Sequence, residues 1–192
     1  MLNIENDDLR KSLFVYYQFL RENNPMRHEL KKIGKAERHT FTGIFERTGY
    51  KTAYHHLNPI YSPTLLLTEI RDLNGKLIAD HLWFNYTKSF LKLGQLLRGD
   101  IIQFDARVAN YTKGYYLCQT NDYKLSYPTK IRLRHAVESP SRQSIPVDDH
   151  WALIGYIMLE NIKFYREQGR TVDSFYTDAF KQWQTNSNNN IM

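Results

Sequence analysis

The sequence predicts an α+β protein in which a five-stranded β-barrel carries helices at both ends of the chain. Asn74-Gly75 separates two strand-like runs, TLLLTEIRD and KLIADHLWF, which is the pattern of a β-hairpin. The run IIQFDARVANY, which begins at Ile101, alternates apolar and polar residues as a half-buried strand does. Apolar residues at helical spacing are found mainly toward the two ends of the chain. Together these observations favour a central sheet with flanking helices.

The remaining strands are predicted on either side of the hairpin. Residues 39–50 form the first strand, with Gly43 marking a bulge or sharp bend. The next thirteen residues, KTAYHHLNPIYSP, contain two prolines and are predicted to form a long loop. A short helix is expected over residues 87–99, ending at Gly99. On strand 101–111, Phe104, Ala106 and Val108 should point inward, and Gln103, Asp105 and Arg107 outward. The fifth strand is YYLCQTNDYKLSY, and SYPTKIRLRH follows the barrel as a further alternating segment.

The helical segments divide the rest of the chain. We expect an N-terminal helical extension over residues 1–36, the barrel over 37–136, a linker over 137–147, helices over 148–185, and a disordered tail over 186–192. Pro25 fits the first position of a helix that stops at Gly34. Asp148-Asp149 can cap a helix from about Trp151 to Gln168, which Gly169 ends. These terminal helices could pack on the barrel, on each other, or on a second copy of the protein.

Five strands with a helix between the third and the fourth are the layout of the OB-fold, a small barrel that commonly binds oligonucleotides. The segments LTEIRDLNGKLIADHLWFNYTKSF and YYLCQTNDYKLSY also resemble the single-stranded-DNA-binding OB domains of the replication protein A type. Members of that family carry a Leu-x-Asp-x-x-Gly hairpin, an aromatic residue on the third strand, and an Asn-Asp-Tyr run on the last strand. The resemblance implies a single-stranded nucleic acid as ligand, with DNA favoured over RNA.

Composition agrees with an anionic partner. The formal net charge is +6 and aromatic residues make up 14% of the chain, and basic proteins accumulate near phosphates. The single cysteine, Cys118, excludes an internal disulfide and a cysteine-based zinc cluster. The longest apolar run, residues 151–159, is too short to span a bilayer. We therefore expect a cytoplasmic protein with no membrane partner and no cofactor.

Aromatic residues that could stack on bases lie at two positions. Trp83 and Phe84 end the third strand, where neighbours point to opposite faces, so one ring should lie in the core and the other outside. The resemblance assigns a second stacking ring to Tyr116, by its distance from Asn121-Asp122-Tyr123. The alternative for all of these rings is a place in the core.

Cations that could contact phosphates are predicted along one strand face and near two turns. Lys130, Arg132 and Arg134 alternate on one face, which is either a solvated strand face or a path for phosphates. The other candidates for nucleic-acid binding are Lys51, Tyr54 and Lys113.

Three functions are compatible with this pattern. The first is a non-catalytic protein that binds single-stranded nucleic acid. The second is an OB-fold protein-interaction module that docks on or inhibits a nucleic-acid enzyme or a ribonucleoprotein, such as an inhibitor encoded by a phage or plasmid. The third is a metal-dependent nuclease, but no spacing singles out two or three carboxylates for a metal, and no catalytic motif is found. We therefore expect a protein that is not an enzyme.

Overall fold

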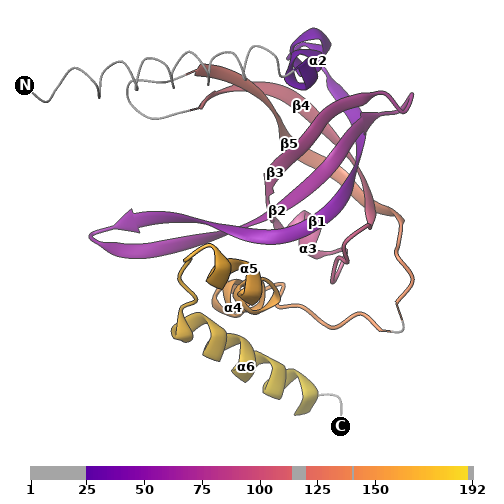
Figure 1. The fold of residues 1–192 in the computed structure, drawn as a ribbon. Coiled ribbons are helices and arrows are strands. Elements are labelled where there is room, and N and C mark those ends of the chain that lie inside the picture. The colour runs from indigo at the N-terminus through magenta and orange to yellow at the C-terminus, as the bar shows by residue number, and fades with distance from the viewer. Residues whose placement is uncertain (1–24, 114–119, 140, 190–192) are drawn as a thin grey trace, which may run out of the picture.

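A computed structural model of the chain describes residues 25–113, 120–139 and 141–189. Its centre is an antiparallel sheet of five strands in the order β3-β2-β1-β4-β5. Along the chain, helices precede and follow the strands (Figure 1). The strands are β1 (Arg38–His55), β2 (Asn58–Asp72), β3 (Leu77–Asn85), β4 (Ile101–Lys113) and β5 (Thr120–His135). The helices are α2 (Pro25–Ile33), α3 (Lys88–Leu91), α4 (His150–Glu160), α5 (Ile162–Glu167) and α6 (Ser174–Asn189).

The α+β class, the five strands and the flanking helices are confirmed, whereas a closed barrel is not. Strand β1 is central and pairs with both β2 and β4. Strands β3 and β5 are the two edges, and within the described residues no hydrogen-bonded ladder joins them. The sheet therefore curls without closing, which leaves a gap between these two edges.

One part of the core lies on the concave side of the curled sheet, and another lies between the sheet and the C-terminal helices. The ring of Phe104 on β4 contacts Phe41 on β1 and Phe84 on β3, at centroid distances of 6.1 and 5.2 Å. Phe90 of α3 contacts Phe84 from one end, and Leu30 of α2 is also buried in this cluster. The contact between Phe84 and Phe104 joins β3 and β4, which are not hydrogen-bonded neighbours, and such a contact across the sheet favours its curvature.

The alternation predicted for β4 is confirmed on its inner face and wrong at one outer position. Phe104, Ala106 and Val108 are buried. Gln103, expected to be exposed, is only 7% exposed, because the Arg134 side chain of β5 crosses it and donates a hydrogen bond to its Oε1 at 3.2 Å. Arg107 is exposed as predicted, and Asp105 is half-buried.

The long loop predicted over residues 51–63 is wrong. Strands β1 and β2 continue to pair as far as His55 and Asn58, so this segment is a β-hairpin. The turn uses His56 and Leu57 at φ values of 46° and 68°, and positive φ at both central residues is the requirement of a type I′ turn. We call residues 51–60 the arm; every one of them is exposed, and Figure 1 shows the arm extending away from the curled sheet.

Two other predicted elements have different bounds in the structure. The helix expected over residues 87–99 is limited to α3, and Gly94 at φ 76° follows in place of a further helical turn. The described residues of the two segments predicted over residues 115–127 and 126–135 form one strand, β5. Its register shifts against β4 where Tyr127 and Lys130 adopt positive φ, and such bulges let one strand bend through the sheet.

Several local predictions are confirmed. Helix α2 begins at Pro25 and is followed by Gly34 at φ 82°. The β1–β2 register shifts around Gly43. The Asp72 carboxylate accepts hydrogen bonds from the Asn74 and Lys76 amides of the hairpin turn, both at 2.9 Å. The part of the predicted N-terminal helical extension that precedes Pro25 lies outside the described residues.

The C-terminal helices pack beneath the β1–β2 part of the sheet (Figure 1). Asp149 caps α4 as predicted, its Oδ1 accepting from the Ala152 amide at 2.9 Å. The expected single helix is divided at Asn161, whose Nδ2 donates to Thr48 Oγ1 of β1 at 2.9 Å. Helix α6 reaches Asn189, beyond the end expected near residue 185. Within the described residues, no helix has both the length and the apolar character needed to cross a bilayer.

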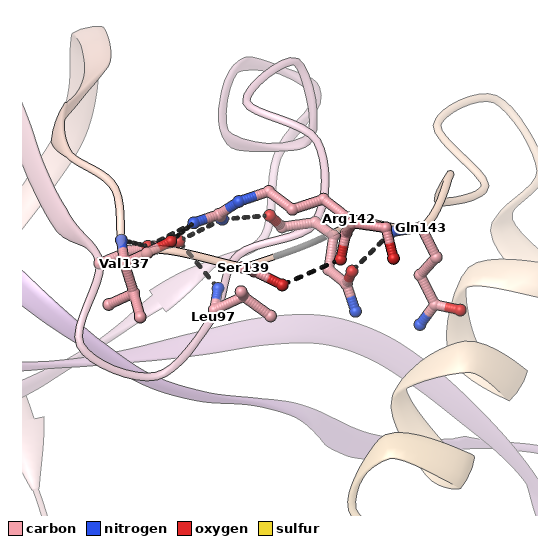
Figure 2. A network of polar contacts seen from close by, with 8 residues as sticks. Leu97, Val137, Ser139, Arg142 and Gln143 are labelled. Carbon is pink, nitrogen blue, oxygen red and sulfur yellow. Dashed lines mark hydrogen bonds and ion pairs between the residues drawn. The ribbon is translucent and has the colours of Figure 1, made fainter.

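The linker predicted over residues 137–147 is bound to the sheet by a buried ion pair (Figure 2). Arg142 donates two hydrogen bonds to the Asp100 carboxylate, at 2.6 and 2.8 Å, and Asp100 is completely buried. Asp100 also accepts from the amides of Leu97 and Val137. Although burial alone would raise the pKa of Asp100, these hydrogen bonds and the Arg142 charge hold it below its ordinary value. The network fixes the path from β5 to α4.

Removal of Arg142 should therefore destabilise the whole protein. In Arg142→Met, Asp100 remains buried without its cation, and we expect the free energy of unfolding in urea to fall by about 3–5 kcal/mol at neutral pH. The matched control is Arg98→Met, which removes the exposed ion pair with Glu46 and should cost about 1 kcal/mol or less.

The pH dependence of this loss follows from the lowered pKa of Asp100. The Asp100–Arg142 pair stabilises the folded protein fully at pH values above the unfolded-state pKa of Asp100, about 3.9. This stabilisation is lost as the pH falls through the lower pKa that Asp100 has in the folded protein. The difference in unfolding free energy between wild type and Arg142→Met should therefore narrow below about pH 4. A difference that stays constant through this range would contradict a charge-paired Asp100.

Of Trp83 and Phe84, Phe84 is the residue on which the stability of the protein should depend. Phe84→Ala removes a ring that packs against both Phe90 and Phe104, and should lower the free energy of unfolding by about 3–5 kcal/mol. Phe175→Ala is the control of the same residue type, because Phe175 is 57% exposed on α6 and should cost about 1 kcal/mol or less. Equal losses in the two variants would contradict the core position of Phe84.

Candidate nucleic-acid interface

A groove of about 790 Å³ lies where the two edges of the sheet approach each other without pairing. Its walls are the end of β3 and the middle of β5, and the base of the arm and the segment after α5 complete it. The lining residues are Tyr50, Lys51, Thr64, Trp83, Phe84, Asn85, Thr87, Arg170 and residues 124–128. The open sheet thus produces a long depression in which side chains from four parts of the chain meet.

The lining is positively charged. Lys51, Lys124 and Arg170 all contribute, and none of the lining residues is an aspartate or glutamate. Lys51 donates a hydrogen bond to the neutral side chain of Asn85 at 2.8 Å, and Lys124 lies over the Tyr111 ring at 5.5 Å. Each contact positions a cation without neutralising it, so the groove favours an anionic ligand.

Two exposed aromatic rings border the same groove. Trp83 is 45% exposed and Tyr127 is 78% exposed. Tyr127 adopts φ 52° at a bulge of β5, and its carbonyl accepts a hydrogen bond from Arg38 at 2.9 Å. The bulge therefore holds the Tyr127 backbone in a conformation that a regular strand would not allow.

The Trp83 ring is positioned by its neighbours. It lies against Gly49 of β1 so closely that a Cβ atom there would come within 2.9 Å of the indole. The guanidinium of Arg47 lies 4.9 Å from the Trp83 ring centroid. One part of the indole is thus packed on the sheet, while the exposed part remains available to a ligand.

The C-terminal segment supplies one of the groove cations. Gly169 at φ 60° ends α5, and the amide of Arg170 donates to the Tyr165 carbonyl at 2.8 Å. Arg170 then donates to the Tyr50 carbonyl at 3.1 Å, and the Tyr50 hydroxyl donates to the Thr171 carbonyl at 2.7 Å. Burial raises the pKa of Tyr50, so this hydroxyl keeps its proton at neutral pH. The helices therefore complete the groove as well as covering the sheet.

The structure places the sequence-predicted site residues in different parts of the molecule. Lys51 and Trp83 line the groove. Phe84 borders it, but its ring is only 4% exposed, so it is the member of the Trp83-Phe84 pair that lies in the core. Tyr54 is exposed on the arm. Tyr116 lies outside the described residues, and so does the side chain of Lys113.

The predicted row of cations on β5 does not line the groove. Lys130 forms an ion pair with Asp105 at 3.0 Å, and Arg134 is hydrogen-bonded to Gln103. Arg132 is exposed and pairs in register with Gln103. These contacts place the row on the outer face of β4 and β5, beyond the stretch of β5 that borders the groove.

Lys124, Tyr127 and Arg170 were not predicted as site residues. The alternation of apolar and polar residues does point to an exposed Lys124, but nothing marks the bulge that turns Tyr127 outward. Arg170 comes from a helix end that is distant in sequence. Among the described residues, no three His, Cys, Asp or Glu side chains gather as a metal site would require.

Compared with protein-family models, with curated proteins and with solved structures, the chain gives no match.

Proposed function

We propose that this chain is a non-catalytic, OB-like protein that binds single-stranded nucleic acid in the groove between β3 and β5. The observation that carries the proposal is the combination of three cations, two exposed aromatic rings and no carboxylate on the lining of one groove. Single strands are bound by cations that follow the phosphates and by aromatic faces on which bases stack. On the resemblance of the hairpin and the last strand, DNA is the favoured ligand.

The strand order supports an OB-like assignment. In this sheet β1 pairs with β2 and β4, β3 and β5 are the edges, and α3 connects β3 to β4. This is the connectivity of a five-stranded, partly open Greek-key barrel. In OB-folds the loop between strands one and two is a principal ligand-contacting element, and here that connection is the arm, which starts at Lys51 of the groove.

The salt dependence of binding tests the groove cations. Lys51→Gln/Lys124→Gln/Arg170→Gln should weaken binding to oligo-dT and reduce the slope of log affinity against log salt by about 0.7 for each phosphate that the variant no longer neutralises. Fluorescence anisotropy over a range of salt concentrations measures both quantities. The control is Lys130→Gln/Arg132→Gln/Arg134→Gln, which removes the same charge from outside the groove and should change the slope less. If the control changes the affinity and the salt slope as much or more, the phosphates contact the outer face of β4 and β5 instead of the groove.

The stacking role of Trp83 is tested with a control of the same residue type. Trp83→Ala should reduce oligo-dT binding by about 1–3 kcal/mol. Trp151 on α4 has a similar exposure, 58%, but is not part of the groove lining, so Trp151→Ala should leave the affinity unchanged. Thermal unfolding of both variants separates a defect in binding from a defect in folding. Equal oligo-dT affinities of the two variants would show that the Trp83 ring does not stack on a base.

The arm favours a second candidate, a protein-interaction module that docks on or inhibits a nucleic-acid enzyme or a ribonucleoprotein. Tyr54, Leu57 and Ile60 are exposed on it, and exposed apolar groups gathered on one projection are typical of protein-binding surfaces. Absence of binding to oligo-dT, oligo-U and duplex DNA at low salt would favour this second function over the first.

A further inference from the structure

Two arginine side chains at the groove each lie over two aromatic rings. The Arg47 guanidinium lies 4.9 Å from the Trp83 ring centroid and 4.2 Å from that of Phe164. The Arg170 guanidinium lies 4.4 Å from the Tyr50 ring centroid and 4.9 Å from that of Tyr165. Stacking fixes the plane of a guanidinium and leaves the N–H groups at its edge able to donate.

Neither arginine has a carboxylate partner within the described residues. Arg47 donates to the Thr48 carbonyl at 3.4 Å, and Arg170 to the Tyr50 carbonyl at 3.1 Å. Glu46 is the neighbour that could neutralise Arg47, but its carboxylate pairs with Arg98 at 2.7 Å. Each guanidinium has five N–H donors, so most of the donors on both groups remain without an acceptor from the protein.

The two positive charges also act on each other. Burial lowers the pKa of Arg47, and the nearby charge of Arg170 lowers it further. A half-buried pair of like charges is unfavourable until an anion binds between or beside them. The stacking rings keep the two guanidiniums in place in spite of this repulsion.

A third donor lies in the same cluster. The Tyr165 side chain is completely buried, and its hydroxyl has no hydrogen-bond partner within the described residues. Burial raises the pKa of Tyr165 to about 12, although the charges of Arg170 and Arg47 oppose this. At neutral pH the hydroxyl is therefore a donor that lacks an acceptor, which is costly for a buried polar group.

We infer that Arg47 and Arg170, with the Tyr165 side chain against Arg170, form a binding site for one phosphate group. A tetrahedral phosphate supplies the acceptors and the negative charge that all three side chains lack. Because Arg47 stacks on Trp83, the site lies next to the ring on which a base would stack. If the phosphate belongs to a nucleic-acid backbone, which rests on the proposed function, this site fixes the backbone beside that base.

Thermal unfolding in inorganic phosphate tests the site directly. At constant ionic strength, with chloride replaced by phosphate, the wild-type melting temperature should rise by several degrees. Arg47→Gln/Arg170→Gln should lose most of this rise and bind phosphate at least about tenfold more weakly. Arg132→Gln, which removes an exposed arginine outside the groove, controls for the general stabilising effect of phosphate on folded proteins and should keep the full rise.

Two conservative variants cover the case in which the double variant does not fold. Arg47→Lys/Arg170→Lys keeps both charges but loses the planar fork, and Tyr165→Phe keeps the ring and removes only the hydroxyl. Both should retain circular dichroism like that of the wild type and bind phosphate several-fold more weakly. A phosphate-dependent rise in melting temperature that is equal in the wild type and in all of these variants would overturn the site and leave the arginines a purely structural role.

Competition with oligo-dT separates this inference from the proposed function. Phosphate should displace oligo-dT from the wild type at constant ionic strength. If phosphate stabilises the wild type specifically while no oligonucleotide binds, the anion site stands and the proposed function fails. If oligo-dT binds the wild type but phosphate stabilises neither the wild type nor the double variant, the inference fails while the proposed function stands.

Discussion

The pair between Asp100 and Arg142 is the contact on which the arrangement of the two halves of the chain depends. Asp100 lies at the start of β4, and Arg142 lies in the segment that leads to α4. A buried carboxylate is tolerated only when its charge and its hydrogen bonds are satisfied. Here one arginine and two backbone amides satisfy them, so the segment after β5 can follow only a path that brings Arg142 to this point.

The path of this segment also determines which side chains line the groove. A chain held at residue 142 places α4 and α5 under the β1–β2 strands, where Asn161 donates to Thr48. The end of α5 then delivers Arg170 to the backbone of Tyr50. The structural ion pair beside β4 and the Arg170 side chain in the groove are therefore parts of one connected arrangement. The C-terminal helices belong to the same folded unit as the sheet.

Local patterns were sufficient to predict the elements but not the groove. The inward-facing residues of β4, the Asn74-Gly75 turn and the Asp149 cap are predicted from signals carried by neighbouring residues, and all three are confirmed. The arm was missed because its turn uses His56 and Leu57 where glycine or asparagine is usual. Lys51, Tyr127 and Arg170 meet only because the sheet curls and the helices return to it, and no periodicity along the chain contains that information.

The arm should unfold locally before the rest of the molecule. Its residues are exposed on both faces, and its strands pair only with each other. Few apolar contacts therefore oppose separation of these strands, whereas Tyr61 at the end of the arm is buried against Tyr50. Backbone amides between Lys51 and Ile60 should exchange with solvent through fraying from the tip, independently of global unfolding. Protection should begin abruptly at the two tyrosines, which mark the boundary between a locally mobile hairpin and the cooperative core.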